Sequence, residues 1–253
     1  MPSDYLERPV LPRLAYSATP AGEKGAHLPG VVFLGGFKSD MNGTKAMYLE
    51  EQCRARGQAF VRFDYSGHGQ SAGDFETLTL SHWRDDARAV IERLMPDKGV
   101  IAGSSMGGWI ALLLALEMPE RVAGLVGIAA AADFTRAITK QLDEEQRALM
   151  AEQGFIDVPS GYENQPYRFT SALIEDGEKH CLLDRDNVIA APVRLVQGMQ
   201  DSDVPWQTAF RIRNSIVGDD VEVILIESGN HRLSRPEDLA LIDRQIIAVC
   251  KIT

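Results

Sequence analysis

Short apolar runs alternate with longer segments of helical spacing along most of the chain. Apolar runs of about four to eight residues between turn residues are typical of buried strands. The predicted strands are Val31–Gly35, Ala59–Asp64, Gly99–Gly103, Val122–Ala129, Val193–Gln197 and Val221–Glu227. The predicted helices are Asn42–Arg56, Leu80–Leu94, Trp109–Glu117, Trp206–Ile216 and Arg235–Cys250. This alternation predicts an α/β fold, with a mostly parallel sheet flanked by helices and catalytic loops at the carboxyl ends of the strands.

The alternation breaks between Ala131 and Asn187, where the sequence has no convincing buried strand. The spacing there predicts amphipathic helices around Arg136–Gln153 and Phe169–His180, separated by the turn-rich stretch Pro159–Pro166. A segment of helical composition inserted between consecutive sheet strands indicates a lid over the strand ends. The expected division of the chain is therefore an α/β core, residues 1–130 and 188–253, and a small helical lid, residues 131–187.

Composition narrows the class of protein. The chain has 253 residues, of which 45% are hydrophobic, enough for one large domain with a sizeable core. No uncharged apolar run of about 18 residues occurs, so the sequence predicts no membrane span. Met1–Glu23 has acidic residues and prolines where a signal peptide would have an apolar region. We therefore expect a cytoplasmic protein.

Charge and cysteine content exclude further classes. Acidic residues outnumber basic residues by 36 to 26, which gives a net charge of −10. With no basic cluster, the sequence argues against nucleic-acid binding and against an anionic membrane surface. Cys53, Cys181 and Cys250 are far apart and odd in number, so they form neither a disulfide framework nor a metal-ligand pattern. We expect them to be reduced and structural.

The segment Gly-Ser-Ser-Met-Gly at residues 103–107 matches the pattern G-x-S-x-G. It follows a predicted strand and precedes a predicted helix, which is the context of a nucleophile elbow. Side chains two residues before and after the serine would collide with the neighbouring strand and helix, so glycine is needed at both positions. Ser105 is therefore the predicted nucleophile, and Ser104 is a neighbour that can only hydrogen-bond locally.

A serine nucleophile needs a base, and the base needs an acid that orients it. In this architecture the chain order is serine, then acid, then histidine. Of the five histidines, only His231 lies in a loop directly after the last predicted strand. The loop after Val193–Gln197 offers Asp201 and, two residues later, its rival Asp203. Asp201 is nearer the strand end, which favours it as the orienting acid.

Acyl transfer also requires two backbone N–H groups that bind the oxyanion. The residue after the nucleophile, Met106, supplies one predicted donor. The loop after the first predicted strand has the sequence Leu-Gly-Gly-Phe at residues 34–37, and the amide of Phe37 is the second predicted donor. A second glycine-rich turn at residues 64–71 lacks a phosphate-binding pattern. We interpret it as a structural loop beside the active site, in which His68 packs or forms a hydrogen bond.

Together these features resemble the α/β-hydrolase superfamily, from about Val31 to the C-terminus. Several segments also resemble the abhydrolase-domain family of the mitochondrial palmitoyl-protein thioesterase, an enzyme also described as mycophenolic acid acyl-glucuronide esterase. These segments are Met41–Ala46, Arg62–Gly67, Gly103–Trp109, His180–Leu183 and Val204–Trp206. The resemblance implies a Ser–Asp–His triad on Ser105, Asp201 and His231, and hydrolysis of S-acyl cysteines and activated oxygen esters. Without a transit peptide, the chain resembles a bacterial-type or cytosolic relative.

The expected activity is therefore that of a serine carboxylesterase or thioesterase (EC 3.1), acting on a small-molecule ester, an acyl thioester or an S-acylated protein. This chemistry needs no metal ion or cofactor. A peptidase or a carbon–carbon bond hydrolase on the same fold is the first alternative. A pair of acidic residues in the lid that binds a free amine would favour the peptidase; Asp143, Glu144 and Glu145 are candidates, although a solvated helix face explains them better. A non-catalytic binding module is the remote alternative. Six large apolar side chains could line an acyl pocket, although such residues more often belong to the plain core: Met47, Phe75, Trp109, Phe134, Phe155 and Trp206.

Overall fold

A central sheet organises the computed structural model, which describes residues 4–159 and 166–250. Within these residues eight strands pair in the order β1-β2-β4-β3-β5-β6-β10-β12. In chain order they are β1 (Asp4–Leu6), β2 (Leu14–Thr19), β3 (Val31–Leu34), β4 (Phe60–Phe63), β5 (Gly99–Ser104), β6 (Val122–Ile128), β10 (Val193–Gly198) and β12 (Val221–Ile226). The strands from β4 to β12 run parallel, whereas β1 and β2 pair antiparallel at one edge. The predicted parallel sheet is therefore confirmed, and β1 and β2 are additions that the sequence analysis missed.

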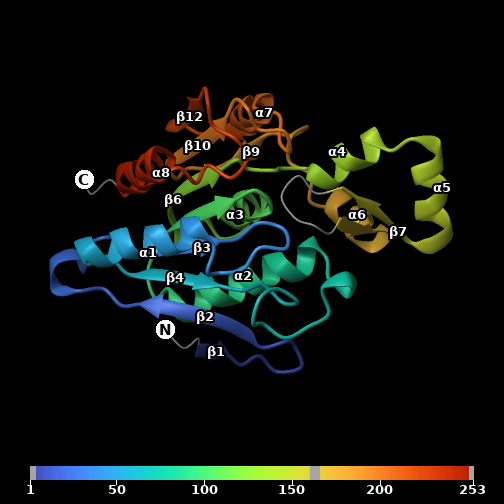
Figure 1. The fold of residues 1–253 in the computed structure, drawn as a ribbon. Coiled ribbons are helices and arrows are strands. Elements are labelled where there is room, and N and C mark those ends of the chain that lie inside the picture. The colour runs from blue at the N-terminus through green and yellow to red at the C-terminus, as the bar shows by residue number, and fades with distance from the viewer. Residues whose placement is uncertain (1–3, 160–165, 251–253) are drawn as a thin grey trace.

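Helices cover both faces of the sheet, as the alternating pattern predicted (Figure 1). They are α1 (Thr44–Arg56), α2 (Leu80–Leu94), α3 (Met106–Glu117), α7 (Gln207–Ser215) and α8 (Pro236–Val249), with short 3-10 helices at Glu23–Gly25, Phe75–Thr77 and Pro119–Arg121. Side chains of β3 alternate between the faces: Val31 and Phe33 pack with α1 and α8, whereas Val32 and Leu34 pack with α2, α3 and α7. This alternation follows from the two-residue period of a strand, and it explains why the buried strands are apolar throughout.

The segment between β6 and β10 differs from its prediction. It contains α4 (Phe134–Gln141), α5 (Glu144–Gln153), β7 (Phe155–Val158), β8 (Tyr167–Thr170), α6 (Ser171–Glu178) and β9 (Asn187–Val188). The expectation of helices alone is wrong, because β7 and β8 form an antiparallel pair, and β9 pairs with β11 (Ile216–Val217). The helix predicted from Phe169 begins only at Ser171, since the preceding residues belong to β8. Most of the predicted turn Pro159–Pro166 lies outside the described residues.

Most of this segment, including α4, α5, α6 and β7, stands at one end of the molecule, beyond the sheet (Figure 1). Polar contacts fix it to the core. The buried carboxylate of Asp176 in α6 accepts hydrogen bonds from the Ser81 amide at 2.7 Å and from the Ser81 hydroxyl at 2.9 Å. The indole of Trp109 in α3 donates to the carbonyl of His180 at 3.1 Å. These contacts hold one side of the segment over α2 and α3.

Candidate active site

The turn between β5 and α3 holds Ser105 in a backbone conformation that few non-glycine residues adopt. Its φ is 54° and its ψ is −118°, and such positive φ values cluster at functional sites. A Cβ atom at Gly103 would overlap the backbone of Gly107, and a Cβ atom at Gly107 would overlap the carbonyl groups of Leu34 and Gly35. The two glycines therefore let strand and helix meet closely enough to form the sharp turn.

The imidazole of His231, in the loop after β12, lies against this serine. Its Nε2 atom is 3.1 Å from the Ser105 Oγ atom, and its Nδ1 atom is 2.8 Å from the Asp201 Oδ2 atom. Because a carboxylate can only accept, Nδ1 carries the proton and Nε2 presents its lone pair to the serine hydroxyl. This tautomer is the one that a general base for Ser105 requires.

Asp201 follows β10, and its side chain is fully buried. The Oδ1 atom accepts hydrogen bonds from the amides of Asp203 at 2.9 Å and Val204 at 2.8 Å, and Oδ2 accepts from Gln197 Nε2 at 2.9 Å. Burial raises the pKa of Asp201, but the hydrogen bond and charge of His231 and the two amides outweigh burial and leave the pKa below its usual value. The rival Asp203 is exposed, and its carboxylate accepts a hydrogen bond from Ser202. The structure thus brings Asp201 to the imidazole.

The two amides predicted to bind an oxyanion are those of Met106, directly after Ser105 in the chain, and of Phe37, in the loop after β3. Met106 is the first residue of α3, where the N–H groups have no partner within the helix. Phe37 follows Gly36. A Cβ atom added at Gly36 would lie 3.4 Å from the Cβ atom of Ser105, so this loop packs against the serine. No described residue accepts a hydrogen bond from either amide. Met106 also lies at the positive end of the α3 dipole, which favours a negative charge nearby.

A cavity of about 680 Å³ opens over these groups, with Ser105, Met106, Phe37 and His231 in its wall. One part of its lining is apolar and comes mainly from the segment between β6 and β10: Ala131, Phe134, Ala137, Ile138, Val158, Tyr167 and Phe169. Another part is polar and comes from the start of α1 and from loops that follow the sheet strands: Ser39, Asp40, Thr44, Lys45, Ser202, Asp203, Arg232 and Ser234. A substrate with one apolar and one polar portion matches this division.

The aromatic residues of this lining were mostly missed by sequence analysis. Of the six residues considered for an acyl pocket, Phe134 is the one that contributes to the described lining. Trp109 is buried in the core, and Met47 is exposed. Tyr167 and Phe169 lie two residues apart in β8 and so share a strand face, a two-residue period that could have identified them.

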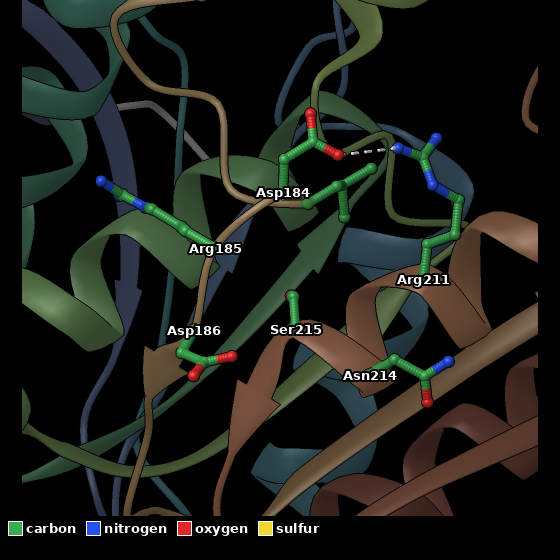
Figure 2. Close-up of a pocket in the computed structure, with 7 residues that line it drawn as sticks. Asp184, Arg185, Asp186, Arg211, Asn214 and Ser215 are labelled. Atoms are coloured by element: carbon green, nitrogen blue, oxygen red, sulfur yellow. Dashed lines mark ion pairs between the residues drawn. The ribbon is translucent and has the colours of Figure 1, made fainter.

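A second, smaller hollow of about 280 Å³ lies between the segment before β9 and α7 (Figure 2). Figure 2 shows Asp184 and Arg211 facing each other there, as an ion pair of 3.8 Å. Its other lining residues are Leu183, Arg185, Asp186, Asn214 and Ser215. None of the predicted site residues lines this hollow, whereas Ser105, Met106, Phe37 and His231 line the larger cavity.

The described residues contain no group of three or more histidine, cysteine or acidic side chains that could hold a metal ion. All three cysteines are free, and burial raises the pKa of Cys53 and of Cys181 to about 12. Such thiols stay protonated and unreactive near neutral pH. None of the helices in the described part of the chain combines the length and apolar character that crossing a bilayer requires.

Comparison with known proteins decides the family. The chain is 39% identical over 239 residues to the mitochondrial palmitoyl-protein thioesterase ABHD10 of Homo sapiens, which covers 94% of this chain and 76% of that protein. The chain belongs to the ABHD10 family of α/β-hydrolases. The bovine ABHD10 protein matches with the same identity and coverage. A family model described as serine aminopeptidase, S33, matches residues 29–153.

Solved structures agree with the ABHD10 assignment. Mouse α/β-hydrolase domain-containing protein 10 superposes with a TM-score of 0.90 at 36% identity, covering 98% of each chain. A protein from Agrobacterium vitis S4 superposes with a TM-score of 0.92 at 37% identity, again covering 98% of each chain. The resemblance and the fold class inferred from the sequence are thereby confirmed. As a member of this family, the chain is a hydrolase.

Proposed function

We propose that the protein hydrolyses acyl esters or acyl thioesters through a covalent intermediate on Ser105. The observation that carries this proposal is the hydrogen-bonded chain from Ser105 through His231 to Asp201 in the wall of the cavity. A serine hydroxyl alone is a weak nucleophile, and an oriented neutral imidazole is the group that activates it.

In the first half of the reaction, Nε2 of His231 takes the proton of Ser105 as the serine oxygen attacks the acyl carbon. The carbonyl oxygen becomes an oxyanion, which accepts hydrogen bonds from the amides of Phe37 and Met106. Asp201 stabilises the imidazolium that has formed. The imidazolium then gives its proton to the leaving thiol or alcohol as the bond from the acyl carbon to the leaving atom breaks.

The second half repeats these steps with water. His231 removes a proton from the water molecule, whose oxygen attacks the carbonyl carbon of the acyl-serine. The same two amides bind the second oxyanion. When the bond to Ser105 breaks, the imidazolium returns a proton to the serine oxygen, and the carboxylic acid leaves. No metal ion or cofactor enters this sequence of steps.

The cavity lining supports an acyl chain as the apolar portion of the substrate. Phe134, Tyr167 and Phe169 provide an apolar wall, and burial of an alkyl chain against such a wall stabilises a complex by about 0.8 kcal/mol per methylene group. The ABHD10 relatives are named palmitoyl-protein thioesterases, which supports a thioester, including an S-acylated protein, as the substrate. A carboxylesterase acting on small oxygen esters is the variant of this proposal.

The proposal includes a division of the chain into an α/β core, residues 1–130 and 188–253, and a lid, residues 131–187. The lid would supply the apolar side of the cavity and thereby select the acyl chain. A cytoplasmic location stays a prediction from the sequence; the ABHD10 relatives carry the word mitochondrial in their names.

A peptidase is the second candidate, since the matching family model is described as a serine aminopeptidase. The acidic cluster that would bind a free amine gives it little support. Asp143 caps α5 by accepting a hydrogen bond from the Gln146 amide at 2.8 Å, and Glu144 and Glu145 are exposed in the first turn. None of the three belongs to the described lining of the cavity. A carbon–carbon bond hydrolase and a non-catalytic binding module remain as outcomes of the test.

The test is a matched panel of acyl thioesters and oxygen esters with chains of two to sixteen carbons, together with aminoacyl anilides. We expect turnover of the acyl substrates, and a loss of about 10³-fold or more in Ser105→Ala. Ser104→Ala, the matched control, removes the neighbouring hydroxyl and keeps turnover within about tenfold. A fluorophosphonate probe should label the wild type and not Ser105→Ala. Turnover in Ser105→Ala, or faster cleavage of anilides than of every ester, contradicts the proposal.

A further inference from the structure

The loop that carries Phe37 is a tight turn with an unusual third residue. The Ser39 amide donates to the Gly36 carbonyl at 3.2 Å, and the Ser39 hydroxyl donates to the same oxygen at 2.7 Å. Phe37 and Lys38 are therefore the central residues of a β-turn. Lys38 has a φ of 57°, whereas Phe37 does not have a positive φ. These signs of φ are those of a type II turn, in which the third position favours glycine.

Lysine at that position favours a different arrangement. Rotation of the peptide between Phe37 and Lys38 would convert the turn to type I, which is compatible with most residues. The rotation would turn the Lys38 N–H group to the opposite side of the loop. Since Lys38 has a Cβ atom, its left-handed conformation needs an interaction that holds this peptide in place.

His68 supplies that interaction. The Lys38 amide donates to its Nε2 atom at 3.2 Å, and its Nδ1 atom lies 3.1 Å from the Ser66 carbonyl oxygen. Because a carbonyl can only accept, Nδ1 carries the proton and Nε2 is the acceptor. His68 is 3% exposed, and its imidazole is enclosed by the rings of Tyr65, Phe75 and Trp83, whose centroids lie 5.0 to 5.5 Å from its own.

The burial of His68 suits the role of a permanent acceptor. Desolvation lowers the pKa of its imidazole to about 4, although the hydrogen bond to the Ser66 backbone acts in the opposite direction. The ring is therefore neutral near pH 7 and keeps the Nε2 lone pair that the Lys38 amide needs. A protonated ring would present a second N–H group to that amide.

The side chain of Phe37 is fixed independently of its backbone. Its ring contacts Phe75 and Trp83 on the core side at centroid distances of 5.0 and 5.8 Å. On the opposite side it stacks on Phe169 at 5.1 Å and meets Tyr167 edge-on at 5.8 Å. The ring of Phe37 is therefore held by its aromatic neighbours, and the peptide that follows Phe37 is held by His68.

We infer that His68 is a positioning residue for the oxyanion site: by accepting the Lys38 N–H group it fixes the peptide that follows Phe37, and so anchors the turn that carries the Phe37 amide beside the nucleophile. This inference rests on the proposed function, because the oxyanion role of Phe37 is part of that proposal. His68 itself touches no reacting atom.

The experiment compares His68→Leu with His68→Gln. Leucine fills the buried site but cannot accept a hydrogen bond, whereas glutamine can place its carbonyl oxygen near the position of Nε2. With 4-nitrophenyl butyrate we expect His68→Leu to lower kcat about 10- to 100-fold, less than the 10²- to 10³-fold cost of removing an oxyanion donor outright. KM should change less than about threefold, because the acyl chain binds elsewhere. His68→Gln should recover most of the lost kcat.

Two further measurements separate positioning from a general loss of stability. Inhibition by a butyl trifluoromethyl ketone, which forms an oxyanion adduct with the serine, should weaken by the same factor as kcat falls. Val90→Ala, which removes buried methyl groups from α2, is the control with a comparable fall in Tm, and it should keep both kcat and the inhibition constant. Hydrogen exchange of residues 36–39 should accelerate in His68→Leu and not in Val90→Ala.

Each outcome bears on one proposal. If His68→Leu keeps kcat within twofold of wild type, or if Val90→Ala loses as much kcat at the same Tm, His68 is only a packing residue and the inference is wrong. Unchanged hydrogen exchange of residues 36–39 in His68→Leu would refute it without any use of activity. Turnover in Ser105→Ala would instead contradict the proposed function.

Discussion

Replacing Asp201 by asparagine should reverse the tautomer of His231, and the hydrogen bonds of the carboxylate show why. The Oδ1 atom accepts two backbone N–H groups, from Asp203 and Val204. An asparagine must therefore place its oxygen at the Oδ1 position and its NH₂ group at the Oδ2 position. That NH₂ group would face His231 Nδ1, which would have to become an acceptor.

The size of the effect follows from this reversal. With Nδ1 as acceptor, the proton of the neutral imidazole moves to Nε2, which can then no longer take the proton of Ser105. Loss of the correct tautomer in a serine triad lowers kcat about 10⁴-fold, which corresponds to roughly 5 kcal/mol of transition-state stabilisation. The substitution should also destabilise the fold, because the new NH₂ group would face another donor, Nε2 of Gln197. Nε2 is kept in place by its hydrogen bond to the Val204 carbonyl at 3.2 Å. We expect the free energy of unfolding to fall by about 1–3 kcal/mol.

The assay is steady-state hydrolysis of 4-nitrophenyl butyrate, combined with urea denaturation. Asp203→Asn is the matched comparison, since that carboxylate is exposed and accepts from the Ser202 hydroxyl, and its expected loss in kcat is less than about tenfold. A loss of less than about 100-fold in Asp201→Asn would refute the tautomer argument, and so would equal losses in the two variants.

Three further predictions concern stability. In Gly107→Ala the new Cβ atom would overlap the Leu34 carbonyl, so we expect a lower Tm together with loss of turnover, and a variant with wild-type Tm would contradict this. His68 has a pKa of about 4 in the folded protein and about 6.5 in the unfolded chain, so between pH 7 and pH 5 the unfolded chain takes up a proton that the folded protein does not. Over this range the free energy of unfolding of the wild type should fall by about 2 kcal/mol more than that of His68→Gln. Equal falls in the two proteins, measured by urea denaturation, would disprove this. The buried side chains of Arg8 and Asp86 form an ion pair of 2.5 Å. Arg8→Met removes this pair and leaves the Asp86 carboxylate buried, so we expect the free energy of unfolding at pH 7 to fall by about 3–5 kcal/mol. A fall of less than about 1 kcal/mol would contradict this expectation.

The sequence predicted the positions of the nucleophile elbow and its partners because each is tied to the end of a buried strand. G-x-S-x-G between strand and helix located Ser105, and loop position favoured Asp201 over Asp203. The structure brings Ser105, Asp201 and His231 into one hydrogen-bonded chain. Their catalytic roles stay a prediction until turnover is measured.

Other parts of the molecule could not be predicted in this way. Residues Leu14–Thr19 form an antiparallel strand near the sheet edge that is only partly buried, so they lack the continuous apolar run that revealed the parallel strands. The two-residue period of β8 shows that Tyr167 and Phe169 share a face, but the period alone does not show that this face turns toward the cavity. The contact between His68 and Lys38 joins residues 30 apart in sequence, and its geometry depends on the sign of one φ angle.

The ring of Phe37 has a consequence for how this enzyme family can evolve. The same residue offers its amide beside the nucleophile and its ring to Tyr167 and Phe169 in the cavity wall. Substitutions in that wall that alter the preferred chain length will also shift the ring, and with it the turn held by His68. We therefore expect selectivity and turnover to be epistatic, with wall substitutions and position 68 coupled in double-mutant cycles. A lineage that acquires a new substrate would then have to change both regions together.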